Sequence, residues 1–306
     1  MKRSVFRSIL TELDSGRRAE LRLSVDDTEF TRVFVPRDRL IILGCGHVSQ
    51  ALCEMASMLD FEITVVDDRP AFANTQRFSK ADRIICGDFV QTIGELAIRN
   101  TDYVCVVTRG HQWDQQCIEA ILSGERMPYY LGLISSRRRA AGLRELLKAE
   151  GYTAERIDQI HSPIGLPIGA ETLSEIAVSI CAELVQFRRQ RCTTDTGDVL
   201  VQKNTDMEML RYLADGEEPT ALLLVISSGG STPVKSGAIM AVNMLGKGYG
   251  TVGGGCGEAA AITRSRRIIG TGRREVIDLD MSNEVAADNG MVCGGSMKII
   301  IEDVTD

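Results

Sequence analysis

Short apolar runs alternate with helix-type spacing from residue 39 onward. The runs "RLIIL", "ITVVD", "YVCVV" and "YYLGLI" each end at or just before a glycine, threonine, serine or acidic residue. Between them, stretches such as "VSQALCEMASMLD" and "WDQQCIEAILSG" place apolar residues three or four positions apart. Runs this short, joined by helices, are typical of parallel strands buried on both faces. The pattern predicts a Rossmann-like α/β domain over residues 39–191, which ends in a helix that Thr172 and Glu175 begin as a capping box.

The pattern changes after residue 191. Residues 192–206 lose the apolar periodicity and are interpreted as a linker. Residues 207–306 are dominated by strand-type runs such as "ALLLVI", "EVIDLD" and "SMKIIIEDV", with one helix after the glycine-rich stretch "GTVGGGCGE". We therefore expect a second, smaller α+β domain here.

Residues 1–38 echo the start of that second domain. Residues 10–25 and 210–225 share five identities at a constant offset of 200, and both segments have the pattern helix, glycine, strand. The N-terminal copy has no counterpart of the glycine-rich stretches that follow in the second domain. It is interpreted as a truncated remnant that supports structure without carrying a site.

Composition and charge narrow the classes of function. The chain has 306 residues, of which 44% are hydrophobic, and a formal net charge of −7. An acidic protein of this kind is a poor partner for nucleic acid or an anionic membrane surface. No apolar run approaches the length of a transmembrane helix, and the first residues lack a signal-peptide pattern. We expect a cytoplasmic protein whose nine cysteines stay reduced.

The first candidate site lies where "LIILGCGHVSQAL" passes from strand to helix. Gly44 and Gly46 stand at the position where backbone amides and a helix N-terminus meet a phosphate group. Asp67 and Asp68 end the next strand, 23 and 24 residues beyond Gly44, where an acidic side chain binds ribose hydroxyls. Ser49 stands at the third glycine position of the dinucleotide fingerprint. The spacing predicts a nucleotide or phosphate site, and the alternative is that the glycines only make a tight turn.

Further candidates cluster at the ends of the expected strands. His47, His111 and His161 each follow a strand, so we expect them at one edge of the sheet. His47 and His111 are candidates for proton transfer. For the three histidines together, a metal site and a polar rim of turn residues are the two alternatives, and no metal is assigned. Arginines at the same strand ends are candidates for an anionic ligand, with a solvated basic helix face as the alternative for the "SSRRR" run. These arginines are Arg69, Arg109 and Arg137.

The second domain offers two stretches expected to be glycine-rich loops, "SSGGSTP" and "GTVGGGCGE". Successive glycines can turn several backbone amides toward one anion. The residues expected to bind there are Gly229, Gly230, Ser231, Gly253, Gly254, Gly255 and Glu258. Cys256 and Cys293 lie beside glycines and are either reactive thiols or small residues chosen for fit. No catalytic residue is assigned, and the candidates are His47, His111, Glu258 and Cys293.

Taken together, these stretches resemble the XdhC/CoxI family of molybdenum-hydroxylase accessory proteins. The resemblance is carried by "LIILGCGHVSQALCEMASMLDFEITVVDDRP", "VTRGHQWD", "YLGLISSRRR", "SSGGSTPVKSGAIMAV", "GTVGGGCGEAA" and "GMVCGGSMKIIIED". Here the Rossmann-like domain comes first, which reverses the order usual in the family. The resemblance implies an accessory protein that binds molybdenum cofactor, the molybdopterin complex, as cargo. It would support sulfuration of the cofactor and its insertion into a xanthine dehydrogenase-type hydroxylase, with Glu258 orienting a donor group of the cofactor.

The resemblance also implies partners and leaves alternatives open. The expected partners are the hydroxylase, a cysteine desulfurase and a second copy of the chain in a homodimer. One alternative is an NAD(P)- or nucleotide-dependent enzyme that uses His47 or His111 as acid or base. Asp67 and Asp68 would then favour NAD over NADP, because they repel a 2′-phosphate. The other is an interaction module whose glycine loops pack a dimer.

Overall fold

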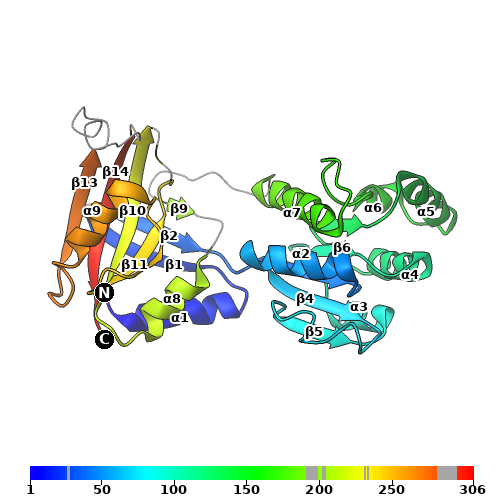
Figure 1. Ribbon diagram of the computed structural model, residues 1–306, viewed down its shortest axis with the longest axis horizontal. Helices are drawn as coiled ribbons and strands as arrows, with labels where there is room; N and C mark the ends of the chain where they lie inside the picture. Colours follow the sequence, from blue (N-terminus) through cyan, green and yellow to red (C-terminus); the bar gives the residue numbers. More distant parts are fainter. Residues whose placement is uncertain (26–27, 191–198, 202–204, 231, 233, 281–294) are drawn as a thin grey trace. The chain divides into compact units, whose positions relative to one another are not determined.

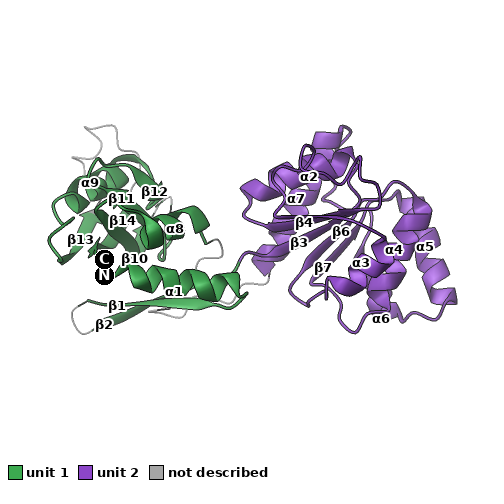
Figure 2. Cartoon of the chain, turned by 90° about the horizontal axis from the view of Figure 1, so that it is seen from below, with its two compact units in different colours: residues 1–36, 193–306 green, residues 37–192 purple. Residues whose placement is uncertain are grey.

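The computed structural model of the chain describes all residues except 26–27, 191–198, 202–204, 231, 233 and 281–294. It divides into two compact units, one of residues 1–36 with 193–306 and one of residues 37–192 (Figure 2). The second unit is therefore inserted into the sequence of the first. Each unit is described by itself below.

The inserted unit is built on a sheet of six parallel strands. Its spatial order is β5-β4-β3-β6-β7-β8, and all five pairings are parallel. The Rossmann-like sheet predicted from the apolar runs is thus confirmed. The strands are β3 (Arg39–Leu43), β4 (Glu62–Asp67), β5 (Arg83–Cys86), β6 (Tyr103–Val106), β7 (Tyr130–Leu133) and β8 (Ile160–His161).

Helices cover both faces of this sheet (Figure 1). Leu40 and Ile42 of β3 pack toward α2 and α7, whereas Ile41 and Leu43 pack toward α3 and α4. This alternation follows from the two-residue period of a strand, and it requires an apolar residue at every position of the run. The helices are α2 (His47–Met58), α3 (Phe89–Glu95), α4 (His111–Leu122), α5 (Arg137–Ala149), α6 (Ala154–Asp158) and α7 (Leu173–Gln190).

The predicted capping box begins α7. The backbone amide of Glu175 donates to the Thr172 hydroxyl oxygen at 3.3 Å, and the amide of Thr172 donates to the Glu175 carboxylate at 2.8 Å. Two amides that the helix cannot pair internally are satisfied in this way.

The other unit holds two sheets. Five antiparallel strands in the order β12-β11-β10-β14-β13 form one, and β1-β2-β9 form the other, in which β2 and β9 run parallel. The strand β9 falls in the segment that the sequence had suggested as a linker. The strands are β1 (Ala19–Val25), β2 (Thr28–Phe34), β9 (Val199–Val201), β10 (Thr220–Gly230), β11 (Ile239–Asn243), β12 (Gly248–Gly250), β13 (Arg274–Asp280) and β14 (Gly295–Val304).

Strand β10 is the centre of the five-stranded sheet, and from Thr220 to Ile226 it is buried on both faces. Ala221, Leu223 and Val225 pack in the cluster that includes residues of α9 (Gly255–Ser265), whereas Leu222 and Leu224 pack with residues of α1 (Arg3–Asp14) and α8 (Met207–Asp215). One expectation was wrong: Ser227–Gly230, expected in a glycine-rich loop, continue β10 and pair with β14. The run "ALLLVI" is apolar at every position because both faces of the strand are covered there.

Both segments of the N-terminal echo contain a helix followed by a strand. The pair α1 (Arg3–Asp14) and β1 corresponds to α8 (Met207–Asp215) and β10. The guanidinium of Arg3, 4% exposed, donates to the carbonyl oxygens of Leu213 at 3.0 Å and Glu218 at 2.6 Å. This buried cation satisfies carbonyls at the end of α8 and so joins the two copies.

Candidate functional site

The strand order places a topological switch point between β3 and β6. From β3 the chain moves to β4 and β5 on one side, and then returns to β6 on the other. At such a point the two crossovers leave in opposite directions, which opens a crevice at the carboxyl ends of the strands. Residues 44–47 follow β3 there, and residues 107–111 follow β6.

The two glycines after β3 have different reasons to be glycine. Gly44 has a φ of +107°, and a β-carbon there would lie 2.3 Å from the carbonyl oxygen of Val107. Gly44 is therefore required by the packing of β3 against the end of β6. Gly46 is the N-cap of α2 with an ordinary φ of −72°, and a β-carbon there would meet nothing within 4 Å. The chain itself does not require Gly46, and α2 begins without a side-chain cap.

Asp67 and Arg69 form an ion pair against the glycine turn. The Asp67 carboxylate, 1% exposed, accepts a hydrogen bond from the Cys45 amide at 2.8 Å. It also accepts two from the guanidinium of Arg69, at 2.8 and 3.0 Å. The carboxylate that the sequence suggested for ribose hydroxyls is thus engaged within the chain.

Asp68 is engaged in the same way by Arg109 from the turn after β6. The Arg109 guanidinium contacts both carboxylate oxygens, one of them at 2.7 Å, and stacks 3.8 Å from the ring of Trp113. These hydrogen bonds lower the pKa of the Asp68 carboxyl. The pair ties the end of β4 to the end of β6 across the switch point.

Arg77 joins this cluster, and sequence reasoning missed it. Its Nε and Nη2 atoms are buried and have no hydrogen-bond partner among the described residues. Its guanidinium lies 5.1 Å from the ring of Phe72, which also carries Arg69 at 3.7 Å. Arg77 comes from the loop after β4, where no periodicity or motif marks it.

The cluster is better suited to binding an anion than to activating a nucleophilic side chain. Three arginines, Arg69, Arg77 and Arg109, lie with two aspartates at this edge. Burial, followed by the Asp67 charge, raises the pKa of the Cys45 thiol to about 12, although Arg69 and Arg77 oppose the change. The thiol in the glycine turn is therefore protonated and unreactive.

The three histidines have different surroundings. His47 and His111 are exposed at the first residues of α2 and α4. His161 instead stacks on Tyr130, with ring centroids 5.2 Å apart, and its Nδ1 lies 3.9 Å from the Glu183 carboxylate. Burial lowers the pKa of His161, although Glu183 opposes the change. Among the described residues, no three His, Cys, Asp or Glu side chains are arranged to hold a metal ion.

The "SSRRR" run begins α5 as expected, with Ser136 as its cap. The Ser136 hydroxyl oxygen accepts from the amide of Arg139 at 3.4 Å. Arg139 pairs with Asp114 of α4 at 3.2 Å, whereas Arg137 is exposed and forms no ion pair with the part of the chain that is described. Asp114 is buried, and this burial raises its pKa despite the Thr108 hydroxyl and Arg139.

In the other unit, the loop "GTVGGGCGE" does gather backbone amides. Gly253, Gly254 and Gly255 all have positive φ, at 128°, 69° and 64°. The amides of Val252 and Gly254 both donate to Oε2 of Glu258 at 3.0 Å. The anion held by this loop is thus the side chain of Glu258 itself.

The remaining candidates of this unit divide into two groups. Gly229 and Gly230 lie in β10, and Cys256 is exposed in the first turn of α9. Ser231 and Cys293 fall outside the residues that the structure describes.

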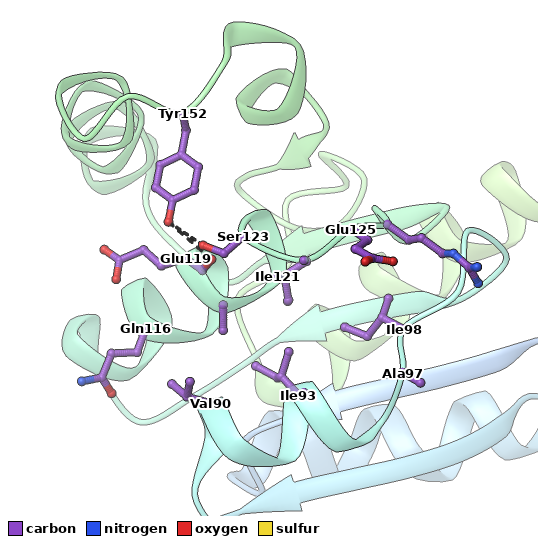
Figure 3. Close-up of a pocket in the computed structure, with 14 residues that line it drawn as sticks. Val90, Ile93, Ala97, Ile98, Gln116, Glu119, Ile121, Ser123, Glu125 and Tyr152 are labelled. Carbon is purple, nitrogen blue, oxygen red and sulfur yellow. Dashed lines mark hydrogen bonds between the residues drawn. The ribbon is translucent and has the colours of Figure 1, made fainter.

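The larger hollow of the inserted unit lies away from all of these residues. It has a volume of about 710 Å³ and is lined by α3, the second half of α4, and the loops that lead into β6 and β7. Figure 3 shows Tyr152 at one end, with its hydroxyl 3.0 Å from that of Ser123. None of the residues singled out from the sequence lines it. No described helix is long and apolar enough to cross a membrane.

Comparison with known protein families finds one match in each of two parts of the chain. The model described as the XdhC Rossmann domain matches residues 40–184, and that of the XdhC and CoxI family matches residues 213–280. The chain is 34% identical over 161 residues to a protein of Bacillus subtilis (strain 168) named as a probable xanthine dehydrogenase subunit, covering 53% of this chain and 46% of that protein. It is 32% identical over 160 residues to the uncharacterized protein YqeB of Escherichia coli (strain K12), covering 52% and 29%.

One solved structure is about as similar to this chain in sequence as these two proteins are. A crystal structure described as a xanthine dehydrogenase from Bacillus halodurans is 33% identical, with 56% of this chain and 48% of that chain covered and a TM-score of 0.48. The chain spans less than half the length of each of these three relatives. On the two family matches and the motifs that they contain, the chain belongs to the XdhC and CoxI family.

Proposed function

We propose that this chain is an accessory protein of a xanthine dehydrogenase-type molybdenum hydroxylase. It would bind the molybdenum cofactor as cargo and support its sulfuration and insertion into the enzyme. Family membership supports this role, as does the name of the Bacillus subtilis relative. The hydroxylase and a cysteine desulfurase are the partners that this role requires, and a homodimer remains part of the proposal.

The observation that carries the proposal is the pair of buried nitrogens, Nε and Nη2, of the half-buried Arg77. An arginine with two buried and unpaired nitrogens costs free energy that a bound anion would recover. Arg69 and Arg109 lie in the same cluster, and the nearby N-terminus of α2 has no side-chain cap. The terminal phosphate of a pterin cofactor is an anion of the kind that arginines and helix N-termini bind.

The open space at Gly46 also fits this ligand class. A β-carbon there would meet no atom of the chain within 4 Å, so the absent side chain leaves room for a group from outside. When bound, the cofactor would supply the redox chemistry of the target enzyme. The residues of this chain would neutralise its phosphate and hold it.

A nucleotide-dependent enzyme is less well supported by the same geometry. A dinucleotide ribose would need the Asp67 carboxylate, which the Cys45 amide and Arg69 already occupy. Binding in that mode would have to break a buried ion pair.

The test is a titration of the purified chain with molybdopterin, NAD and NADP. We expect Arg77→Gln to weaken molybdopterin binding by about 10- to 100-fold, the usual effect of losing hydrogen bonds from a charged group. Gly46→Val should weaken it by filling the open space. Arg22→Gln removes the same charge from an exposed strand of the other unit and should bind as the wild type does.

Two results would contradict the proposal. Equal molybdopterin binding in Arg77→Gln and Gly46→Val would exclude this edge as the site. Saturable binding of NAD without molybdopterin would support the enzyme instead. Co-purification with a xanthine dehydrogenase-type enzyme, and its activation by the loaded chain, tests the accessory role separately.

A further inference from the structure

A second cavity lies beside the switch point, between α4 and α5. It has a volume of about 220 Å³ and opens above the end of β7. Its polar side is formed by His111, Asp114, Ser135 and Arg139, and its apolar side by Leu133, Leu143 and Leu146. All of these residues belong to one unit, and the proposed cofactor site does not include this cavity.

A glycine in the middle of α5 keeps the cavity open. Gly142 lies inside the helix Arg137–Ala149, and a β-carbon there would meet nothing within 4 Å. A glycine inside a helix is destabilising relative to alanine. Neither its backbone conformation nor a close neighbour explains this glycine. Gly142 lines the cavity, so a larger side chain at this position would fill part of it.

The polar side of the cavity is arranged for a negative charge. Arg139 donates to Asp114 through Nη2 at 3.2 Å. Among the described residues the other donors of its guanidinium have no acceptor, so they can bind a second one. Its side chain is 42% exposed. The first turns of α4 and α5 both lie at this end, and His111 begins α4. Their dipoles favour an anion as well.

Asp114 limits how much negative charge the cavity can accept. It is 5% exposed, and it accepts from the Thr108 hydroxyl at 2.5 Å on one oxygen and from Arg139 on the other. A dianionic phosphate would place two negative charges beside this carboxylate and would be repelled more strongly than a ligand with one. A carboxylate brings a single charge in a planar shape that matches the guanidinium.

From these contacts we infer that the cavity is a binding site for a small monocarboxylate whose short apolar chain packs against α5. Arg139 binds the carboxylate. Leu133, Leu143 and Leu146 contact the apolar chain. Gly142 provides the room that the ligand fills. The site is independent of the proposed accessory role, since it involves neither Arg77 nor Gly46.

The experiment is calorimetric titration of the full chain with acetate, butanoate, hexanoate and inorganic phosphate. Affinity should rise roughly fourfold per added methylene from acetate to butanoate, as expected for burial of each methylene. Arg139→Gln should lower the affinity for butanoate by at least about tenfold. Phosphate should bind more weakly than butanoate.

Two glycine variants separate binding from folding. Gly142→Leu should abolish carboxylate binding while its thermal midpoint stays at or above that of the wild type, because leucine is the better helix former. Gly94→Leu is the matched control: Gly94 lies on α3, lines the larger hollow and has equal space for a side chain. It should bind as the wild type does.

Three results would overturn the inference. They are no saturable binding of any carboxylate to the wild type, unchanged binding in Gly142→Leu, and binding of phosphate as tight as or tighter than that of butanoate.

Discussion

The carboxylate of Glu258 accepts a hydrogen bond from the backbone amide of Gly254 at 3.0 Å. The same oxygen, Oε2, also accepts from the amide of Val252 at 3.0 Å and the hydroxyl of Thr251 at 2.5 Å. Three glycines in a row with positive φ bend the chain so that these donors converge. The loop is a nest for an anion that the first turn of α9 itself provides.

Removing that carboxylate should destabilise the unit that contains it. Glu258→Ala removes the charged acceptor of two amides and a hydroxyl, and the loss of these charge-assisted hydrogen bonds should cost about 1–3 kcal/mol of unfolding free energy. Glu258→Gln keeps a neutral carbonyl oxygen and should cost less. Chemical denaturation of both variants measures the difference. Wild-type stability in Glu258→Ala would mean that the loop does not depend on this contact.

The contribution of Glu258 should also depend on pH. Burial alone would raise its pKa, but the hydrogen bonds from Thr251, Gly254 and Val252 outweigh burial and lower it from the usual 4.5. A carboxyl with a lowered folded pKa stabilises the protein fully above its unfolded pKa and loses that effect as the pH falls through the folded value. The gap in unfolding free energy between wild type and Glu258→Gln should therefore narrow below about pH 4.5. A gap that stays constant there would contradict this assignment.

The two glycines after β3 should respond differently to alanine. Gly44→Ala places a β-carbon 2.3 Å from the Val107 carbonyl oxygen and holds a φ of +107°, so it should cost at least about 2 kcal/mol. Gly46→Ala meets no neighbour and should change stability by no more than about 1 kcal/mol. Thermal unfolding of the two variants, made in parallel, compares them. Equal losses would show that Gly46 also has a structural role.

Ser49 should be replaceable by alanine without loss. Its side chain is fully buried in α2, and its hydroxyl has no hydrogen-bond partner among the described residues. Alanine removes that unpaired group and is the better helix former, so Ser49→Ala should gain up to about 1 kcal/mol. Ser49→Gly, the residue of the dinucleotide fingerprint, should instead lose stability. A clear loss in Ser49→Ala would reveal a bond that the hydroxyl makes.

Thiol labelling should separate the cysteines into two groups. Burial raises the pKa of Cys45 and Cys53 to about 12 and of Cys181 to about 11. Iodoacetamide should modify the exposed Cys86 and Cys256 in the native chain and leave the buried cysteines unmodified until unfolding. Mass spectrometry of the labelled peptides identifies the sites. Rapid labelling of native Cys45 would show that the glycine turn opens.

Much of the fold could be predicted from local pattern. The runs around Ile41 and Val104 are apolar at every position because both faces of the sheet are covered, and that condition is visible in the sequence. Thr172 and Glu175 are three residues apart, so their capping box could also be predicted. The "SSGGSTP" stretch was misjudged because glycines suggest a loop, whereas pairing with β14 extends β10 through Gly230.

The candidate site was only partly predictable. The sequence identified Gly44 and Gly46 but could not distinguish them, because the carbonyl of Val107 that requires Gly44 comes from a distant strand. Arg77 was missed because a loop arginine has no local signal. Its significance comes from burial beside Phe72, which depends on how the loop folds back.

By itself, the sequence determined the order of strands and helices, the two kinds of domain and the family. These follow from the period of apolar residues and from short motifs, which are properties of neighbours along the chain. The tertiary structure alone decided that Asp67 and Asp68 are held by Arg69 and Arg109, that Glu258 fills its own loop, and that residues 1–36 belong with residues 193–306. The pair of Asp68 with Arg109 and the joining of residues 1–36 to residues 193–306 are contacts between distant segments. The contacts of Asp67 with Arg69 and of Glu258 with Gly254 are close in sequence, but each forms only in the turn conformation that the packing of the whole unit sets.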